Sequence, residues 1–387
     1  MTAPGVHIGG NDGPTAFLES FGDHMEAASA PPSLDDVGRS IGIGILGCGA
    51  IVQAAHLPAY RQASLSVVAV ADRDARCARA VAKRFAIPRW YSSAEDLLAD
   101  PEVQVVDVAV DPDSQASVAR RAIADSRHLL CQKPFSESLE TARDLVRLAD
   151  QAGTVLGVNQ QMRWEPLVRG LRACMDADLV GQVYDVLIDV DVLTDWTGWA
   201  WMVDRARLEG FYHSIHHLDS VRYLLGEPTA LWAALDRVPG QQARGETRAT
   251  YQLRFPDGIS ATIRTHHDNR TDQPRAVIRV RGTEGSLDGE LGMLYDYPHG
   301  RADRISVRTR AGQSATHEFT RRWVPDAFVA SMSDVLRAVA QGGAPSASGE
   351  DNLLTLELVL AAYESERTGR RVTVGVRGTP HTGRTTS

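Results

Sequence analysis

The sequence contains one dense glycine pattern, Gly42-Ile43-Gly44-Ile45-Leu46-Gly47-Cys48-Gly49-Ala50-Ile51-Val52. It predicts a short apolar strand, a glycine turn and the start of a helix. Gly47 allows a tight turn, and Gly49 has no Cβ, so that a pyrophosphate can approach the backbone and the N-terminus of the next helix. Val52 stands where a third glycine or alanine is often found. The pattern predicts a dinucleotide site, with Ala50 and Ile51 beside the phosphates.

A second apolar run ends at Asp72, 25 residues after Gly47. A carboxylate at this place can accept both ribose hydroxyls of an adenosine. The alternative is that Asp72 caps the helix expected to begin near Ala75. Asp72 favours NAD, because its charge would repel the 2′-phosphate of NADP. The neighbouring Arg73 could bind that phosphate, which leaves NADP open.

The composition is ordinary for a globular protein: 43% of the 387 residues are hydrophobic and 23% are charged. The formal net charge of −8 argues against a general nucleic-acid binder. The four cysteines lack the spacing of a disulfide framework or a zinc ribbon, which indicates a reducing cytoplasm. No apolar run of about 18 residues and no signal-peptide pattern is evident, so we expect no membrane span and no signal peptide.

Short apolar runs alternate with amphipathic helices in the first part of the chain. This alternation predicts an α/β N-terminal domain with a doubly wound parallel sheet, a Rossmann domain, over residues 39–160. An N-terminal extension, residues 1–38, is expected to be partly ordered, with a short helix near 15–27. The expected strands are 40–47, 66–71, 104–110, 128–131 and 155–158, and the expected helices are 50–62, 74–86, 94–99, 114–125 and 138–152.

After about residue 160 the pattern changes to alternating strands separated by turns. It predicts an α+β C-terminal domain with an open-faced, largely antiparallel β-sheet over residues 161–375. The last helix could pack back on the first domain, and a tail, residues 376–387, is expected to fray. The expected helices are 165–177, 212–225, 325–341 and 349–367, and the expected strands are 183–193, 229–237, 246–255, 258–267, 276–282, 303–309 and 314–319.

Four more motifs follow the glycine turn in order: Ala55-His56-Leu57-Pro58-Ala59, Leu129-Leu130-Cys131-Gln132-Lys133-Pro134, Val158–Pro166 and His216-His217-Leu218-Asp219, the last with Gly226 seven residues later. Over roughly residues 40–375 the chain resembles the glucose–fructose oxidoreductase, inositol dehydrogenase and rhizopine-catabolism family (Gfo/Idh/MocA). The resemblance implies a Rossmann domain that binds NAD or NADP and an open sheet that commonly forms subunit contacts. Most members oxidise a secondary alcohol of a sugar or cyclitol, or reduce the ketone.

Two residues match the family's catalytic motifs. Lys133 matches the lysine of the E-K-P motif, just past a buried strand, where its ammonium can hydrogen-bond the reacting oxygen. His216 matches the histidine of the D-x-x-x-H-x-x-D pattern and as a neutral imidazole could accept the hydroxyl proton. His213 lies within one turn and is a second candidate. The alternatives are a solvated lysine and a histidine held by packing.

The chain departs from the family pattern around this lysine. Tyr212 replaces the family Asp four residues before the histidine, and Gln132 replaces the Glu before the lysine. The loss of two carboxylates predicts a lowered pKa for the Lys133 ammonium. Tyr212 could hydrogen-bond the substrate instead. The family's A-T-P-x-x-x-H stretch is only loosely matched, and there Asp111 and Gln115, like Gln132 and Lys133, are expected beside the cofactor.

Substrate contacts are expected from the start of the second domain and from a tryptophan-rich loop. Trp199 lies in that loop, whose indoles could stack on a sugar or fill the core or a subunit contact. Arg163 and Trp164 follow the last strand of the first domain, and a salt bridge between domains is the alternative for Arg163. Asp219 of the histidine motif is also expected to contact the substrate.

The histidines also permit a metal hypothesis. His213 and His217 are spaced i, i+4, which can place two imidazoles on one helix face. No third ligand is evident, and the resemblance implies a family that normally works without metal, so we expect no metal site. The stretch His266–Arg270 ends a strand and is read either as a solvated turn or as a polar strand end at the cleft.

The sequence as a whole is interpreted as a cytoplasmic, NAD-dependent or NADP-dependent dehydrogenase of a small sugar or cyclitol. No nucleic-acid or membrane partner is expected, and the open sheet favours a homodimer or homotetramer. Two other hypotheses stay open. One is a redox-cycling glycosidase or lyase without net cofactor turnover, and the other is a regulator that binds sugar and nucleotide without catalysis.

Overall fold

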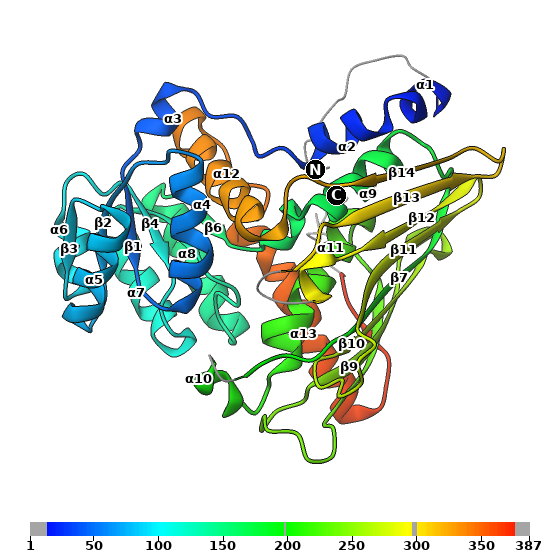
Figure 1. Cartoon of the computed structure of the whole chain (residues 1–387). Helices are drawn as coiled ribbons and strands as arrows, with labels where there is room; N and C mark the ends of the chain where they lie inside the picture. Colours follow the sequence, from blue (N-terminus) through cyan, green and yellow to red (C-terminus); the bar gives the residue numbers. More distant parts are fainter. Residues whose placement is uncertain (1–13, 197–198, 296–299, 376–387) are drawn as a thin grey trace, which may run out of the picture.

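The computed structural model describes residues 14–196, 199–295 and 300–375. They form a six-stranded sheet and a nine-stranded sheet, with helices between the two (Figure 1). The predicted fold class is confirmed, because the first sheet is parallel and the second is mixed and largely antiparallel. Within the described ranges, no helix has the length and apolar character needed to cross a membrane.

The first sheet is made of β1 (Ile43–Leu46), β2 (Val67–Ala71), β3 (Arg89–Tyr91), β4 (Val105–Val108), β5 (His128–Cys131) and β6 (Leu156–Val158). Its order is β3-β2-β1-β4-β5-β6, and its neighbours are parallel. In this order the chain switches direction between β1 and β4, and the crevice at the carboxyl ends of these strands is where such sheets bind ligands. The edge strand β3 was not predicted, because it has three residues and none is fully buried.

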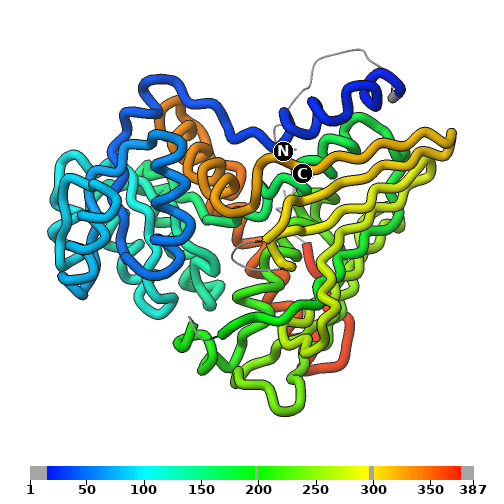
Figure 2. The backbone as a smooth tube through the Cα atoms, in the orientation of Figure 1, coloured from blue at the N-terminus to red at the C-terminus, as the bar shows by residue number. Residues whose placement is uncertain are grey.

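Helices cover both faces of the first sheet. One face is covered by α6 (Ala94–Ala99), α7 (Pro112–Ala124) and α8 (Leu139–Ala152), and the other by α4 (Leu57–Gln62), α5 (Ala75–Phe85) and α12 (Phe328–Gln341). Met332 of α12 belongs to the same apolar cluster as Ile43 and Ile45 of β1. The chain therefore returns from the second sheet to the first, which Figure 2 shows as the orange segment beside the blue one.

The second sheet has the order β14-β13-β12-β11-β7-β10-β9-β8-β15, and β7 and β10 pair in parallel. Its strands are β7 (Val183–Asp191), β8 (Ala230–Asp236), β9 (Arg248–Arg254), β10 (Ser260–His266), β11 (Arg275–Gly282), β12 (Gly285–Glu290), β13 (Arg304–Thr309), β14 (Ser314–Glu318) and β15 (Val372–Thr373). Alternation along β7 buries Val186, Ile188 and Val190 on one face and leaves Asp189 and Asp191 on the other. The sequence patterns missed β12, which contains two glycines, and β15, which has two residues.

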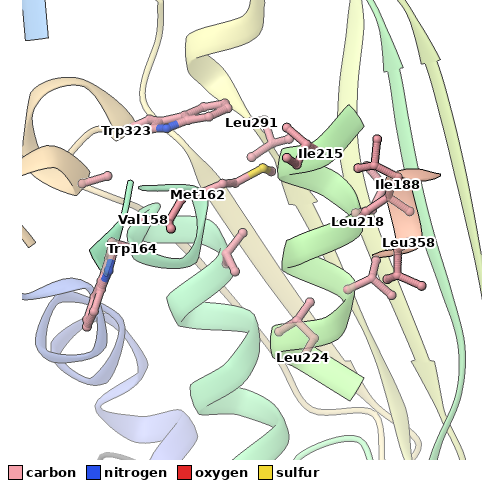
Figure 3. Close-up of a cluster of buried hydrophobic side chains, with 14 of the residues drawn as sticks. Val158, Met162, Trp164, Ile188, Ile215, Leu218, Leu224, Leu291, Trp323 and Leu358 are labelled. Carbon is pink, nitrogen blue, oxygen red and sulfur yellow. The ribbon is translucent and has the colours of Figure 1, made fainter. Parts of the chain in front are cut away.

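The buried face of the second sheet packs against α9 (Pro166–Asp176), α11 (Ile215–Leu225) and α13 (Gly349–Thr368). Figure 3 shows Ile215 and Leu218 of α11 next to Ile188 of β7 and Leu358 of α13. Helix α13 also contacts α8 and β6 of the first sheet. Shared apolar packing thus joins the two sheets around α11 and α13.

The N-terminal extension contains α1 (Pro14–Glu19), α2 (Phe21–Ser29) and α3 (Asp36–Ser40), where the sequence predicted a single short helix. Helix α2 packs on α9 and on the edge strand β14. Glu26 of α2 accepts hydrogen bonds from the backbone N–H of Thr320 at 2.8 Å and from the ring of His317 at 2.8 Å. Helix α2 is therefore bound to the second sheet, although it precedes β1, the first strand of the Rossmann domain.

Candidate active site at the crevice between the two sheets

A cavity of about 740 Å³ begins at the carboxyl ends of β1, β4 and β5 and reaches the tryptophan-rich loop and the start of α11. It is the crevice that the strand order predicts. Among the predicted catalytic and cofactor residues, those that line it are Gly47, Gly49, Ala50, Ile51, Asp72, Arg73, Asp111, Gln115, Gln132, Lys133, Tyr212, His213 and His216.

The glycine turn has the geometry that its sequence implies. Gly47 has φ +94°, and a Cβ there would lie 2.3 Å from the carbonyl oxygen of Ala109. A Cβ on Gly49 would have no described heavy atom within 4 Å. Gly47 is thus required by the backbone, whereas Gly49 leaves open space at the cavity wall. This cradle fits the pyrophosphate of a dinucleotide.

Asp72 lies at the end of β2, next to that turn. Its carboxylate accepts hydrogen bonds from the backbone N–H groups of Cys48 at 2.8 Å and Asp74 at 2.9 Å. Asp74, not Asp72, caps α5 by accepting from the N–H of Arg76 at 2.9 Å. The capping alternative for Asp72 is therefore wrong, and its carboxylate is held by the backbone at the cavity wall. The Arg73 side chain is 88% exposed beside it.

Two of the predicted cofactor residues also organise the protein itself. Asp111 caps α7 by accepting from the N–H of Ser114 at 3.0 Å. The Gln115 amide donates to the carbonyl oxygens of Gln132 and Pro134, both at 2.8 Å. Gln115 therefore braces the loop that carries Lys133, where the peptide bond to Pro134 is cis.

Gln132 connects Lys133 to a buried histidine. Its Oε1 accepts from the backbone N–H of Lys133 at 3.0 Å, and its Nε2 donates to His56 Nε2 at 2.8 Å. His56 Nδ1 lies 2.6 Å from Asp107 Oδ2, and both side chains are fully buried. Since the amide nitrogen can only donate, His56 Nε2 accepts and its proton is on Nδ1. Gln132 thus fixes the orientation of the His56 ring behind the lysine.

Lys133 projects from the first domain to the second. Its Nζ donates to the backbone oxygen of Tyr212 at 2.6 Å. Burial lowers the pKa of Lys133 to about 8, and the negative charge of Glu209 opposes that shift. The lowered pKa agrees in direction with the sequence expectation, but its main cause is burial rather than the loss of neighbouring carboxylates.

His216 lies at the start of α11 and faces the same cavity. It is 7% exposed, its ring meets that of Trp323 edge-on with centroids 5.7 Å apart, and its Nδ1 has no hydrogen-bond partner among the described residues. Burial and the nearby charge of Lys133 hold the pKa of His216 well below its usual range. The imidazole is therefore neutral at pH 7 and able to accept a proton.

Tyr212 lines the cavity and is held by the protein through its hydroxyl. Its hydroxyl donates to the Glu137 carboxylate, which also accepts from Arg207 at 2.9 Å. The hydroxyl proton thus has a protein partner, while the hydroxyl oxygen at the cavity wall can accept, and the hydrogen bond from Tyr212 to substrate stays a prediction. What Tyr212 gives Lys133 is its backbone carbonyl.

Glu209 was not predicted as a site residue. His267 belongs to the stretch His266–Arg270, and of its two interpretations the polar strand end at the cleft is the one that holds for His267, which is buried and lines the cavity. Glu209 is fully buried in the π-helical turn η3 (Glu209–Ser214), and His267 follows β10. Glu209 Oε2 lies 2.8 Å from His267 Nδ1 and 3.4 Å from His213 Nδ1. The i, i+4 spacing of Glu209 and His213 was visible in the sequence. His217, the expected partner of His213, is buried and outside the cavity lining among the described residues.

Arg163, Trp164 and Asp219 are absent from the described cavity lining. Arg163 Nε and Nη2 donate to both oxygens of Asp219 at 2.7 Å, and Nη2 also pairs with Asp351. Thr355 donates to Asp219 at 2.6 Å. The substrate role predicted for Arg163 and Asp219 is therefore wrong. The Arg163 guanidinium and the Asp219 carboxylate bind each other in a buried ion-pair network that joins α11 to α13.

The tryptophan-rich loop does reach the cavity. Trp196, Trp199 and Trp201 all line it, and the Trp196 ring lies 5.5 Å from that of His213. Residues 197–198 of this loop lie outside the described ranges. The described indoles give the end of the cavity nearest the histidines an aromatic wall, which suits the C–H faces of a sugar.

Comparison with known proteins identifies the family. The model of an oxidoreductase family with an NAD-binding Rossmann fold matches residues 41–160, and the model of its C-terminal alpha/beta domain matches residues 173–374. D-apiose dehydrogenase of Paraburkholderia graminis is 30% identical to this chain, over 85% of the chain and 88% of that protein. 1,5-Anhydro-D-fructose reductase of Ensifer adhaerens is 27% identical, over 84% and 96%.

Solved structures agree with this. An oxidoreductase from Agrobacterium radiobacter, in complex with NAD⁺, L-tartaric acid and magnesium, matches with a TM-score of 0.76 and 25% identity, over 86% of this chain and 98% of that one. Levoglucosan dehydrogenase, in complex with NADH and levoglucosan, has a similar fold, with a TM-score of 0.75 at 20% identity, over 86% of this chain and 99% of that one. The predicted Rossmann cofactor domain is confirmed, and this chain belongs to the Gfo/Idh/MocA oxidoreductase family.

Proposed function

We propose that this protein is a dehydrogenase that moves hydride between a secondary alcohol of a sugar or cyclitol, or its ketone, and the nicotinamide of NAD. The observation that carries the proposal is the meeting of Lys133 and His216 at one cavity wall, although they come from different domains. The glycine cradle, Gly47 and Gly49, lines the same cavity. The sugar oxidoreductases among its relatives support the substrate class.

The two side chains divide the work on the reacting oxygen. Bound NAD would supply the hydride acceptor. His216, neutral at pH 7, would take the hydroxyl proton, and the Lys133 ammonium would hydrogen-bond the oxygen as negative charge develops there. Trp323, in edge contact with His216, limits the rotation of that imidazole. His213 remains a second candidate for the proton, since it faces the same cavity.

NAD is proposed as the preferred cofactor. Both oxygens of Asp72 are held by backbone N–H groups at the end of β2, so the charge stays at the cavity wall. A fixed negative charge there suits two ribose hydroxyls and repels a 2′-phosphate. The exposed Arg73 offers no buried phosphate site that would offset this repulsion.

The test is turnover by the purified protein with NAD⁺ or NADP⁺ and a panel of aldoses, anhydrosugars and cyclitols. Lys133→Met and His216→Asn are each expected to lower kcat/KM by about 10²–10⁴-fold, because each removes a group that acts on the transferred proton or the developing charge. NAD⁺ binding, measured by calorimetry, should persist in His216→Asn. Lys83→Met is the matched control, since Lys83 is exposed on α5, away from the cavity.

The other two readings predict different results. Tightly held NAD with no net reduction, together with cleavage of a glycoside, would support the redox-cycling glycosidase. Sugar and nucleotide binding without any product would support the regulator. A cytoplasmic location stays part of the proposal, in keeping with the four unpaired cysteines.

A further inference from the structure

Three side chains that can bind a metal, one glutamate and two histidines, meet at or just behind the wall of the cavity. Glu209 and His213 come from η3, and His267 comes from the end of β10. One ligand atom from each lies within 4.8 Å of the other two. The His213 and His267 rings stack with centroids 4.1 Å apart, so their nitrogens face the same carboxylate. A carboxylate with two imidazoles is a donor set of catalytic zinc sites and of other first-row metals.

The spacing of these atoms suits a small divalent ion. Zinc binds imidazole nitrogen and carboxylate oxygen at roughly 2.0–2.2 Å, which places tetrahedral ligands about 3.3 Å from one another. The Glu209–His267 and Glu209–His213 separations of 2.8 and 3.4 Å lie on either side of that value. Shifts of a few tenths of an ångström in side-chain position would therefore admit the ion.

The surroundings hold one side of the cluster and leave the other open. The Ser214 hydroxyl donates to Glu209 Oε1 at 2.7 Å, which orients the carboxylate from behind. His213 and His267 both line the cavity, so further coordination positions would face the substrate space. The π-helical turn is what brings Glu209 and His213 to this place, and such turns are frequent at functional sites.

We propose that Glu209, His213 and His267 form a binding site for a divalent transition-metal ion, for which Zn²⁺ is the best match. The open positions would take water or an oxygen of the bound sugar. The site adds to the proposed dehydrogenase: Lys133 and His216 are not among its ligands, and a metal on His213 would leave His216 as the group that accepts the hydroxyl proton. This proposal differs from the expectation of no metal site in the sequence analysis. The third ligand, His267, lies 58 residues from Glu209 along the chain, so no local spacing indicates it.

The test is metal binding by the full chain without nucleotide or phosphate. The protein is stripped with a chelator and titrated with Zn²⁺ in competition with a chromophoric chelator, and separately with Co²⁺, whose visible absorption reports its geometry. We expect one equivalent bound, with the intense absorption of a four- or five-coordinate cobalt site. Failure of the wild-type protein to bind either ion would overturn the proposal and leave a hydrogen-bonded cluster that orients His213.

Variants locate the site. Glu209→Gln and His267→Asn keep the shape of the cluster and should weaken binding by at least about 100-fold. His266→Asn is the matched control, because His266 is the neighbouring residue on β10 but pairs with Asp191 on the opposite face of the sheet. It should bind Zn²⁺ as the wild type does. Equal binding by all four proteins would show that the ion lies elsewhere, for example on cysteines, and would also overturn the proposal.

Discussion

The pKa of Lys133 gives the proposed reaction a definite pH dependence. Burial lowers this pKa to about 8, so the side chain is an ammonium below that pH and an amine above it. If the ammonium stabilises the developing alkoxide, kcat/KM should fall as the pH rises through about 8. A pH–rate profile measured from pH 6 to about 10 checks this. A rise through the same pH would contradict the assignment and make the neutral lysine the base.

A single carboxylate is expected to set the cofactor preference. Asp72→Asn removes the charge and keeps one of the two oxygens that accept from backbone N–H groups, so the ratio of kcat/KM for NADP⁺ to that for NAD⁺ should rise about tenfold or more. Steady-state kinetics with both nucleotides measures it. Asp74→Asn alters a neighbouring acid that caps α5 and should leave the ratio unchanged. A preference that moves equally in both variants would count against Asp72.

At the scale of elements, the buried ion pairs tie helices together rather than bind substrate. Asp219→Ala would leave Arg163 with one carboxylate partner in a buried place, and we expect it to lower the free energy of unfolding by about 3–5 kcal/mol. Urea denaturation measures this loss, and the KM for sugar should be unchanged. Asp176→Ala breaks the half-exposed pair with Arg172 on α9 and should cost about 0.5 kcal/mol or less.

Two buried carboxyl groups lie at the start of α9. They should make the free energy of unfolding fall as the pH rises. Glu165 caps α9 and is fully buried beside Asp303, and burial together with Asp303 raises its pKa well above the ordinary 4.5. Its folded pKa exceeds its unfolded pKa, so its stabilisation is complete below about pH 4.5 and is lost as the pH rises through the folded value. Glu165→Gln keeps a cap oxygen and removes this titration.

Urea unfolding between pH 5 and about 9 tests that pair. The free energy of unfolding should fall more for the wild type than for Glu165→Gln over this range. Only the wild type holds a buried carboxyl proton that is released on unfolding, and this release becomes more favourable as the pH rises. Parallel stability curves for the two proteins would mean that the Glu165 proton does not contribute.

At the scale of the whole molecule, the outer face of the second sheet is a surface of charged pairs. Asp189 accepts from Arg264 at 2.7 Å and from Arg275 at 2.8 Å, and similar pairs continue onto β12. We propose that this face forms the contact of a homodimer or homotetramer, as the sequence analysis expects. Because charged contacts are screened by salt, light scattering should show the oligomer dissociating more readily at high than at low ionic strength. A monomer under all conditions would contradict the proposal.

The sequence predicted those parts of the molecule that depend on contiguous patterns. The glycine turn, Asp72, Lys133 and His216 each lie in a local motif whose element follows from hydrophobic period, and all four line one cavity. Short elements such as β3 and β15 carry too few residues for a period to be visible. The Glu209–His267 contact joins segments that meet only when β10 pairs within the sheet, and no local pattern encodes that meeting.

The central claim is that Lys133 and His216 act together on a sugar oxygen in a cavity that also holds NAD. It is tested most directly by NADH formation across the sugar and cyclitol panel, with the wild type, Lys133→Met, His216→Asn and Lys83→Met compared side by side. The account predicts NADH from the wild type and from Lys83→Met with one class of compound, and a loss of at least about 100-fold in the other two. Undiminished turnover in Lys133→Met and His216→Asn, or no NADH from the wild type with any compound, would contradict it.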